Sequence, residues 1–507
     1  MSTLFAKKPL SMLLKEQTGE NRLKRVLGPI GLTSLGVGAI IGTGIFVLIG
    51  EVTHQKAGPA VMLSFVVAGT ACLFAALCYA EFASMVPVAG SAYTYAYATL
   101  GELMAWIIGW DLVLEYAVGS ATVASGWSGY FQKLLALVGR AFNQDWHIPK
   151  KIASAPFNYI AKTGQFESAH SFMDLPAFLI TLAITIILVR GIQESVRFNA
   201  AMVIVKLAVV AFVIGVGAFY IDPKNWHPFA PMGWTGISFF GNTIFGQEDG
   251  GGKPLGMVAG AATIFFAYIG FDSVSTQAEE CKNPKRDLPI GIMASLILCT
   301  ILYIAVAAVL TGMVPTDQIS EKAPVSNAFA SRGLVWADWL ISVGALTGIT
   351  SVLLVMMLSQ PRVFLAMSRD GLLPPSFFAA VHSKFRTPWK STIMCGFAVA
   401  LMSGFLPLGI LAELVSIGTL FAFVIVCGAV LIMRRTNPDA ERPFRAPLVP
   451  FVPIAGISIC LLLMFSLPAE NWYRLLGWLA IGLVIYFSYG RKHSVLAEHN
   501  AGTNPAA

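Results

Sequence analysis

Charged residues are scarce in this sequence, and the scarcity excludes an ordinary soluble protein. Only 12% of the 507 residues are charged, whereas 56% are hydrophobic. A soluble domain has about 25% charged residues. The apolar residues form long blocks, such as Ala200–Phe219 and Ser295–Leu310, and a block of about 20 residues spans the roughly 30 Å hydrocarbon layer of a bilayer. The composition therefore predicts a polytopic membrane protein surrounded by a lipid bilayer.

Motifs for metal binding, disulfides and enzyme catalysis are also missing. The seven cysteines form no CxxC pair, and most of them lie inside apolar blocks, which indicates small packing residues. No HExxH or GxSxG motif occurs. We therefore expect no enzyme, no bound metal and no cofactor.

The basic residues give a formal net charge of +7, but their distribution argues against a nucleic-acid partner. They occur in short tracts between the apolar blocks, without a basic stripe or interleaved aromatic side chains. Such tracts are topology signals, because Lys and Arg are enriched in cytoplasmic loops. The first ~27 residues are polar and basic and resemble no signal peptide, so the first apolar block is expected to direct insertion.

Hydropathy divides the chain into about twelve spans of helical length. Because twelve is even, both termini lie on one side of the membrane. That side carries about 22 Lys and Arg residues against about 11 on the other, so both termini are predicted to be cytoplasmic in the cell inner (plasma) membrane. The basic loop 131–174 lies on the other side, but long loops often escape this rule. The spans are predicted at 28–51, 60–85, 102–130, 175–191, 198–221, 255–278, 288–313, 335–366, 391–408, 410–433, 449–467 and 472–489.

These spans divide the chain into six regions, in which two halves of five spans are followed by two further helices. The regions are an N-terminal tail (1–27), the first half (28–221), an external linker (222–254), the second half (255–433), the two further helices (434–489) and a C-terminal tail (490–507).

The first span is rich in glycine, with Gly36, Gly38, Gly42 and Gly44 inside nine residues. Each glycine weakens a regular helix by up to about 1 kcal/mol. An unwound segment exposes amides and carbonyls that lipid cannot satisfy, so it is tolerated only beside a polar cavity. A zwitterion suits such a cavity, with its carboxylate at the amides near Gly42–Gly44 and its ammonium at the preceding carbonyls. The same glycines could instead serve close helix packing, since Gly38 and Gly42 form a GxxxG motif.

The sixth span is interrupted at a matching place. Gly270 and Asp272 break an aromatic stretch well inside the apolar block. Interrupted segments at corresponding positions of two halves point to a transporter binding site. The alternative is a helix that simply ends at Gly270.

Lys206 lies about eight residues into the fifth span, or roughly 12 Å deep at 1.5 Å per residue. Burial disfavours the charged ammonium, which suits a residue that gains and loses a proton. Alternatively, the lysine could extend its ammonium to the cytoplasmic interface.

Two carboxylates lie four residues apart on the third span, Asp111 and Glu115, and therefore share one helix face. Because lipid is a costly environment for charge, we expect this face to point inward. Glu115 could relay a proton, pair with Lys206 or attract a cationic substrate, whereas Asp111 could be purely structural. In the eighth span, the hydroxyls of Thr350 and Ser351 could bind an ion or could bond to their own helix.

A series of motifs follows the chain in order. With them the sequence resembles the amino acid–polyamine–organocation (APC) superfamily of transporters, and within it the bacterial members of the cationic amino acid transporter branch. The resemblance covers all twelve predicted spans. The motifs are Gly38–Phe46, Cys78–Phe82, Val86–Tyr93, Phe266–Asp272, Glu279–Glu280, Asn283–Pro284 and Ser368–Gly371.

The resemblance implies an all-α fold of about 12 transmembrane helices. Five plus five of them form an inverted repeat with broken helices 1 and 6, and the protein works by alternating access. The resemblance places the substrate against the backbone of Ile40, Thr43 and Gly44, and against Phe266, Ala267 and Ile269, with Phe266 also acting as a gate. It matches Glu115 to a glutamate of the cationic branch. It matches Lys206 to a lysine whose amine takes the place of a sodium ion, which favours a proton as the coupling ion.

The expected function is secondary active import of L-amino acids by proton-coupled symport, with cationic amino acids as the leading substrates and neutral ones as a second class. Two alternatives stay open. The protein could exchange one amino acid for another, or it could be an amino acid-binding membrane sensor, although the tails are short for a signalling domain of typically 50 or more residues. A small accessory membrane subunit is compatible with this architecture, but the sequence does not identify one.

Overall fold

The structure is a computed structural model that describes residues 3–9, 12, 27–86, 91–160, 165–190, 192–240, 242–249, 254–320 and 323–500. Some of the sequence-based predictions fall on other residues. Outside the described residues lie most of the tail 1–27, residues 87–90 of the Val86–Tyr93 motif, residues 250–253 of the predicted linker, the side chain of Glu279 and residues 501–507 of the second tail.

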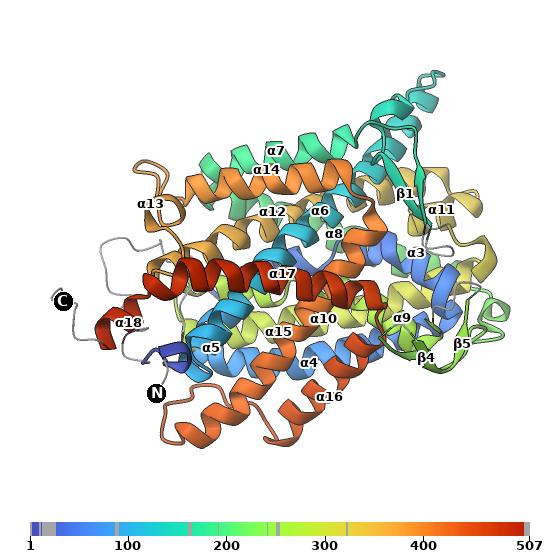
Figure 1. Ribbon diagram of the computed structural model, residues 1–507. Coiled ribbons are helices and arrows are strands. Elements are labelled where there is room, and N and C mark those ends of the chain that lie inside the picture. The colour runs from blue at the N-terminus through green and yellow to red at the C-terminus, as the bar shows by residue number, and fades with distance from the viewer. Residues whose placement is uncertain are drawn as a thin grey trace.

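The described residues are mostly helical, and their long helices overlap the predicted spans. In Figure 1 these helices run side by side between two ends of the molecule. They are α4 (Val61–Met85), α6 (Glu102–Ala141), α7 (Leu175–Arg190), α8 (Ile192–Gly217), α10 (Pro284–Met313), α12 (Val335–Arg369), α14 (Trp389–Phe405), α15 (Leu408–Thr436), α16 (Phe451–Phe465) and α17 (Ala469–Ser488).

Eight described stretches are long and apolar enough to cross a membrane, and α7 and α16 are shorter apolar helices. The first stretch, Pro29–Met85, contains two of the predicted spans. They merge because the residues between them are also helical, as η4 (Thr53–Ala57) and η5 (Gly58–Ala60). The helix α6 continues to Ala141, beyond its predicted end at residue 130. The pattern is that of a polytopic membrane protein.

The two ends of the molecule differ. The first and last described helices, η1 (Thr3–Phe5) and α18 (Val495–Asn500), lie at one end in Figure 1, which we call the terminal side, together with α5 (Ala92–Thr99) and α13 (Pro375–Phe378). The opposite end, the loop side, carries α11 (Pro324–Ser331) and three antiparallel two-stranded sheets. The strand pairs are β1 (Phe157–Ile160) with β2 (Gln165–Ser168), β3 (Ile237–Phe239) with β4 (Asn242–Phe245), and β5 (Gln247–Glu248) with β6 (Pro254–Leu255).

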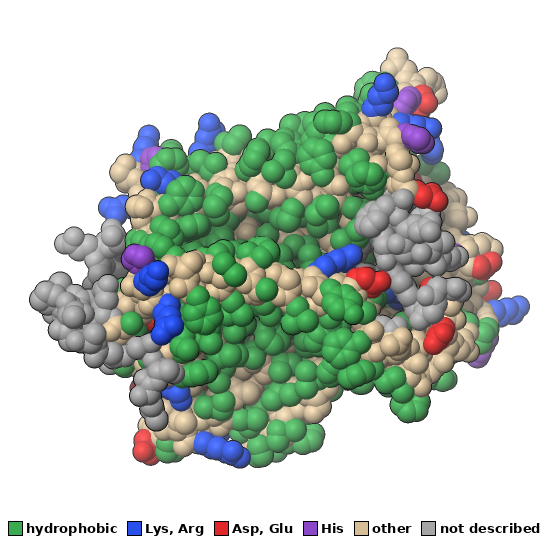
Figure 2. Space-filling model, viewed as in Figure 1, with side chains coloured by type: hydrophobic (Ala, Val, Ile, Leu, Met, Phe, Trp, Pro, Cys, Tyr) green, Lys and Arg blue, Asp and Glu red, His purple; other side chains and the backbone are tan. Residues whose placement is uncertain are grey.

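The surface has an apolar middle. Hydrophobic side chains cover the centre of the face shown in Figure 2, whereas charged side chains gather at its two ends. Large apolar residues are widely exposed, among them Ile204 and Val484, each at 69%. In water such a surface would be unfavourable, but the hydrocarbon layer of a bilayer is as apolar as these side chains. The surface is therefore one that faces lipid.

The helix α6 runs through the centre of the molecule. It packs against α12 and α15, while α10 packs against α4 and against α2 (Pro29–Ile40). An apolar stretch of 18 residues in α6 is 89% buried, whereas the corresponding stretch in Ala469–Ala497, which contains α17, is 22% buried. Polar residues carried by α6 are therefore shielded from lipid, whereas α17 is peripheral.

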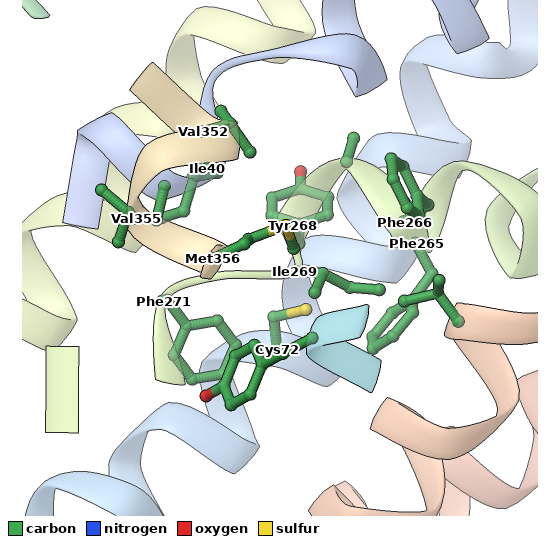
Figure 3. Close-up of a cluster of buried hydrophobic side chains, with 14 of the residues drawn as sticks. Ile40, Cys72, Phe265, Phe266, Tyr268, Ile269, Phe271, Val352, Val355 and Met356 are labelled. Atoms are coloured by element: carbon green, nitrogen blue, oxygen red, sulfur yellow. The ribbon is translucent and has the colours of Figure 1, made fainter. Parts of the chain in front are cut away.

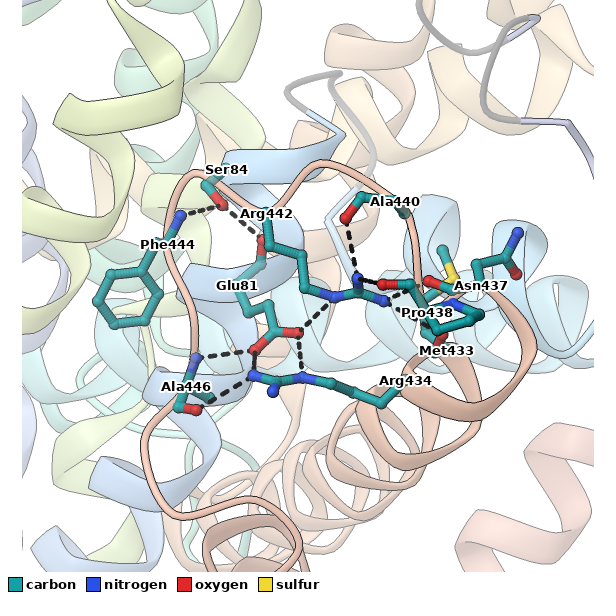
Figure 4. A network of polar contacts seen from close by, with 10 residues as sticks. All are labelled: Glu81, Ser84, Met433, Arg434, Asn437, Pro438, Ala440, Arg442, Phe444 and Ala446. Atoms are coloured by element: carbon teal, nitrogen blue, oxygen red, sulfur yellow. Dashed lines mark hydrogen bonds and ion pairs between the residues drawn. The ribbon is translucent and has the colours of Figure 1, made fainter.

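A buried ion network holds the terminal side of α4 and α15 together (Figure 4). Arg434 donates two hydrogen bonds to Glu81, at 2.9 and 2.7 Å. Arg442 lies 3.3 Å from the same carboxylate and also donates to the carbonyls of Met433 and Asn437, at the C-terminal end of α15. These arginines therefore satisfy a buried carboxylate and the last carbonyls of a helix.

Candidate functional site

The first break interrupts the first predicted span. The helix α2 ends at Ile40, and Ile41 has an extended backbone. Helical structure resumes with η3 (Gly44–Leu48) and continues as α3 (Ile49–Val52). Among the described residues, the amides of Gly42 and Thr43 donate no backbone hydrogen bond. The break therefore presents the free amides that a carboxylate can bind.

The second break lies in the sixth predicted span. The helix α9 (Met257–Ile264) continues as the short helix η9 (Phe265–Tyr268), and the chain turns at Gly270 before η10 (Asp272–Glu280) begins. Gly270 has φ +120°, and a β-carbon there would lie 2.8 Å from the carbonyl oxygen of Ala39. A side chain is therefore excluded both by the backbone conformation and by the neighbouring break.

The two breaks touch each other. A β-carbon at Gly44 would lie 2.4 Å from Ala267, so the absence of a side chain allows this contact. On α10, the hydroxyl of Tyr303 lies 2.7 Å from the carbonyl oxygen of Ile40 and 2.9 Å from that of Ala267. The sequence analysis missed Tyr303, because a single tyrosine in an apolar span gives no local signal. The predicted site residues of the two spans are thus adjacent, and the site is closed.

Lys206 lies behind the first break. Its side chain is fully buried, and its ammonium donates to the carbonyls of Gly38 and Ile41, at 2.8 and 2.9 Å, and to the hydroxyl of Ser351, at 2.8 Å. These three bonds match the three donors of an ammonium group. The side chain therefore points into the protein and does not extend to an interface.

The predicted ion-site pair is divided between two places. Ser351 lies beside Lys206, with its hydroxyl 3.0 Å from the carbonyl oxygen of Gly38. Thr350 instead donates to Leu346 on its own helix and accepts a bond of 2.9 Å from the indole of Trp127. The structure therefore brings only Ser351 to the break.

The walls around the breaks are largely apolar. In Figure 3, Val352 and Met356 of α12 lie with Ile40 on one side of the cluster, and Phe266 and Ile269 lie on the other. Phe266, in η9 at the second break, is only 4% exposed. Thr43 adds a buried hydroxyl that has no hydrogen-bond partner among the described residues. The side chains around the breaks therefore offer apolar contact with few polar groups.

Three carboxylates are buried near α6. Asp272 accepts a bond of 2.6 Å from Tyr116. Asp111 lies against Gly418 on α15, and neither it nor Glu115 accepts a hydrogen bond by normal geometry from the described residues. The hydroxyl of Thr419 faces Glu115 but donates to a carbonyl of its own helix. Glu115 is thus a buried carboxylate that does not pair with Lys206.

Ion pairs close the structure on both sides of the breaks. On the terminal side, Glu280 at the end of η10 pairs with Arg362 on α12, at 2.5 Å, and both side chains are at most 4% exposed. On the loop side, Lys133 of α6 pairs with Asp338 of α12, at 2.8 Å, and bonds Ser326 of α11, at 2.5 Å. Buried ion pairs therefore join α12 to η10 on the terminal side, and α12 to α6 on the loop side.

Comparisons with known proteins agree with this architecture. A family model described as "Amino acid permease" matches residues 27–486. The chain is 48% identical to the branched-chain amino acid permease BcaP of Bacillus subtilis, over 98% of this chain and 99% of the relative. It is 46% identical to the methylthioribose transporter of the same organism, over 98% of this chain and all of the relative. The vacuolar cationic amino acid transporter 4 of Arabidopsis thaliana is 38% identical, over 87% of this chain and 68% of the relative.

Proposed function

Because the chain belongs to the amino acid permease family, within the cationic amino acid transporter branch of the APC superfamily, we propose that it imports L-amino acids by proton-coupled symport with alternating access. It is a membrane transporter and not an enzyme. The observation that carries the coupling proposal is the position of Lys206 against the first break.

Lys206 couples proton binding to the shape of the site. The charged ammonium holds two carbonyls of helix 1 and Ser351 of α12 at once. Loss of its proton removes one donor and the charge, which weakens the connection between the break and α12. Helix 1 is then free to move, and the site opens to the side that released the proton. This lysine fills the position beside the break with its own positive charge, which favours a proton over sodium.

The amino acid binds by its backbone groups to the breaks. Its carboxylate accepts from the amides of Gly42 and Thr43, which also face the start of a helix. Its ammonium binds carbonyl oxygens exposed by the breaks, near Ile40 and Phe266. Since the breaks are in contact in the closed structure, the substrate separates Gly44 from Ala267 when it enters.

The walls favour an apolar side chain. Ile40, Ile269, Val352 and Met356 supply hydrocarbon surface, and burial of such surface contributes roughly 25 cal/mol per Å². The 48% identical relative is named as a branched-chain amino acid permease. Neutral amino acids such as leucine are therefore the first candidates.

Cationic amino acids are the second candidate class, because Glu115 supplies a buried carboxylate that has no normal hydrogen-bond partner in the described part of the chain. A guanidinium or ammonium group that reaches Glu115 would satisfy it. The relative named for methylthioribose makes that compound a necessary member of any substrate screen.

We further propose twelve crossings, arranged as a five-plus-five inverted repeat with α16 and α17 outside it, and a cytoplasmic terminal side. The broken helices at corresponding places support the repeat, and the basic loops on the terminal side support the orientation. A cysteine introduced at Lys150, on the loop side, would then react with an impermeant thiol reagent in intact cells.

Uptake into liposomes tests the function. Purified protein should accumulate labelled leucine or arginine when an inward proton gradient is imposed, and unlabelled competitors should rank the other amino acids and methylthioribose. Equal uptake with and without the gradient, with no amino acid inside, would remove the symport proposal. Uptake that instead requires internal amino acid would identify an exchanger.

A further inference from the structure

A small pocket that is open to solvent lies on the loop side of the breaks. It is formed where α9, α15, η4 and the turn between α16 and α17 meet. Among the described residues that line it, one side chain is charged and none is acidic. The lining includes Lys56, Thr263, Ser416, Ser466, Pro254 and Pro468.

Lys56 is held in place at this pocket. Its carbonyl accepts a bond of 2.8 Å from the amide of Gly256, and its ammonium donates to the hydroxyl of Thr263, at 2.8 Å. Among the described residues Lys56 forms no ion pair, and Thr263 is its one side-chain partner. An ammonium has three donors, so two of them are available to a ligand.

The pocket shares its walls with the candidate transport site. Thr263 lies three residues before Phe266 on the same helical segment, toward the loop side. Ser416 lies three residues before Thr419, whose hydroxyl faces Glu115. The pocket and the breaks are therefore both formed by α9 and its continuation, and the pocket lies nearer the loop side.

We propose that Lys56 forms an outer binding site that receives the carboxylate of the incoming amino acid before the substrate reaches the broken helices. This inference rests on the proposed function and orientation. A fixed ammonium in a pocket whose described lining carries no acidic group attracts carboxylates and repels cations. The site therefore selects for the carboxylate that every amino acid carries. Discrimination between amino acid side chains is left to the apolar residues around the breaks. Thr263 positions the lysine and is not itself the receptor.

Substitution of Lys56 by methionine tests the proposal, because the change keeps the length of the side chain and removes its charge. Initial uptake rates would be measured in intact cells, which expose only the outer face, with the amino acid preferred in the substrate screen. We expect Lys56→Met to raise KM by about three- to tenfold with Vmax within about twofold of the wild type. Lys56→Arg should restore KM, and Lys150→Met, at an exposed lysine on the same side, should leave it unchanged.

Salt dependence distinguishes an electrostatic receptor from a structural link between α9 and η4. The wild-type KM should rise between about 10 and about 150 mM salt, and the KM of Lys56→Met should not. Thr263→Val, which breaks the link but keeps the charge, should retain the salt dependence. An unchanged KM in Lys56→Met, a fall in Vmax alone, or failure of arginine to restore KM would overturn the proposal. A wild-type protein that takes up no amino acid would instead refute the proposed function.

Discussion

Tyr303 joins the two breaks through one hydroxyl group, which lies 2.7 Å from the carbonyl oxygen of Ile40 and 2.9 Å from that of Ala267. The two carbonyls belong to helices that are far apart in sequence. Tyr303 is fully buried on α10, so no water competes for its hydroxyl from the surface. The closed arrangement of the breaks therefore depends on a residue outside both broken helices.

Tyr303→Phe should weaken this closed arrangement, because it removes the hydroxyl and leaves two buried carbonyls without their partner. Such a loss costs about 1–3 kcal/mol, so we expect a roughly tenfold slower uptake and a lower Tm. Uptake rates and thermal unfolding in detergent provide the measurement. Tyr268→Phe is the matched control, because its hydroxyl bonds Phe65 on α4 and bridges no break. Equal loss of uptake in both variants would contradict the bridging role.

Lys206→Met should uncouple transport from the proton gradient. The variant keeps an apolar stem of similar length but loses the three bonds to Gly38, Ile41 and Ser351. Loss of even one hydrogen bond to a charged group costs about 1.5–3 kcal/mol. We therefore expect gradient-driven accumulation in liposomes to fall by about tenfold or more. Ser351→Ala, which keeps the titrating amine, should retain the response to the gradient. Wild-type accumulation by Lys206→Met would exclude the coupling role.

Gly44→Ala should abolish transport while the chain still folds. A β-carbon at this position would lie 2.4 Å from Ala267, so the two breaks could not meet. Uptake should be undetectable. The same change at Gly428 on α15, where an added β-carbon would meet no atom within 4 Å, should leave uptake unchanged. Because alanine is a better helix former by about 1 kcal/mol, Gly428→Ala should be at least as stable as the wild type. Normal uptake by Gly44→Ala would show that the contact is dispensable.

Lys8 and Asp370 should be energetically coupled. Their side chains form a buried ion pair of 2.5 Å, and Tyr93 also donates to Asp370, at 2.6 Å. Removal of one partner leaves a buried charge, at a cost of about 3–5 kcal/mol. Lys8→Met and Asp370→Asn should each lower the Tm, and the double variant should lose less than the sum. Additive losses of Tm would show that Lys8 and Asp370 do not stabilise the terminal side as a pair.

Local signals in the sequence were sufficient to locate the helices and the breaks. Long apolar blocks predicted the long helices, and clustered glycines with an interrupted aromatic stretch predicted the unwound segments near Gly42 and Gly270. The packing alternative for the glycines also holds in part, since Gly42 lies against Val352 and Gly44 against Ala267. One residue type serves both purposes, because the absence of a side chain permits an unusual backbone and a close contact alike.

Contacts between distant residues could not be predicted in the same way. Lys8 and Asp370 are separated by 362 positions, and neither has a neighbouring motif that indicates the other. The depth of Lys206 predicted its burial, but its partners follow only from the packing of α8 against α2 and α12. The same holds for Tyr303 and for the pairing of Lys56 with Thr263.

The contact between Gly44 and Ala267 also affects how this protein tolerates change. Each position is constrained by the atoms of the other, with the backbone of Ala267 directly opposite Gly44. A scan that varies one position at a time would therefore class both as immutable. A paired variant, in which Gly44 becomes alanine and position 267 becomes glycine, removes the contact with the β-carbon of Ala267 but keeps the contact with its α-carbon at 2.4 Å. A compensating side-chain change at position 267 therefore cannot replace the glycine at position 44, and only a shift of one broken segment against the other could accommodate a larger residue there.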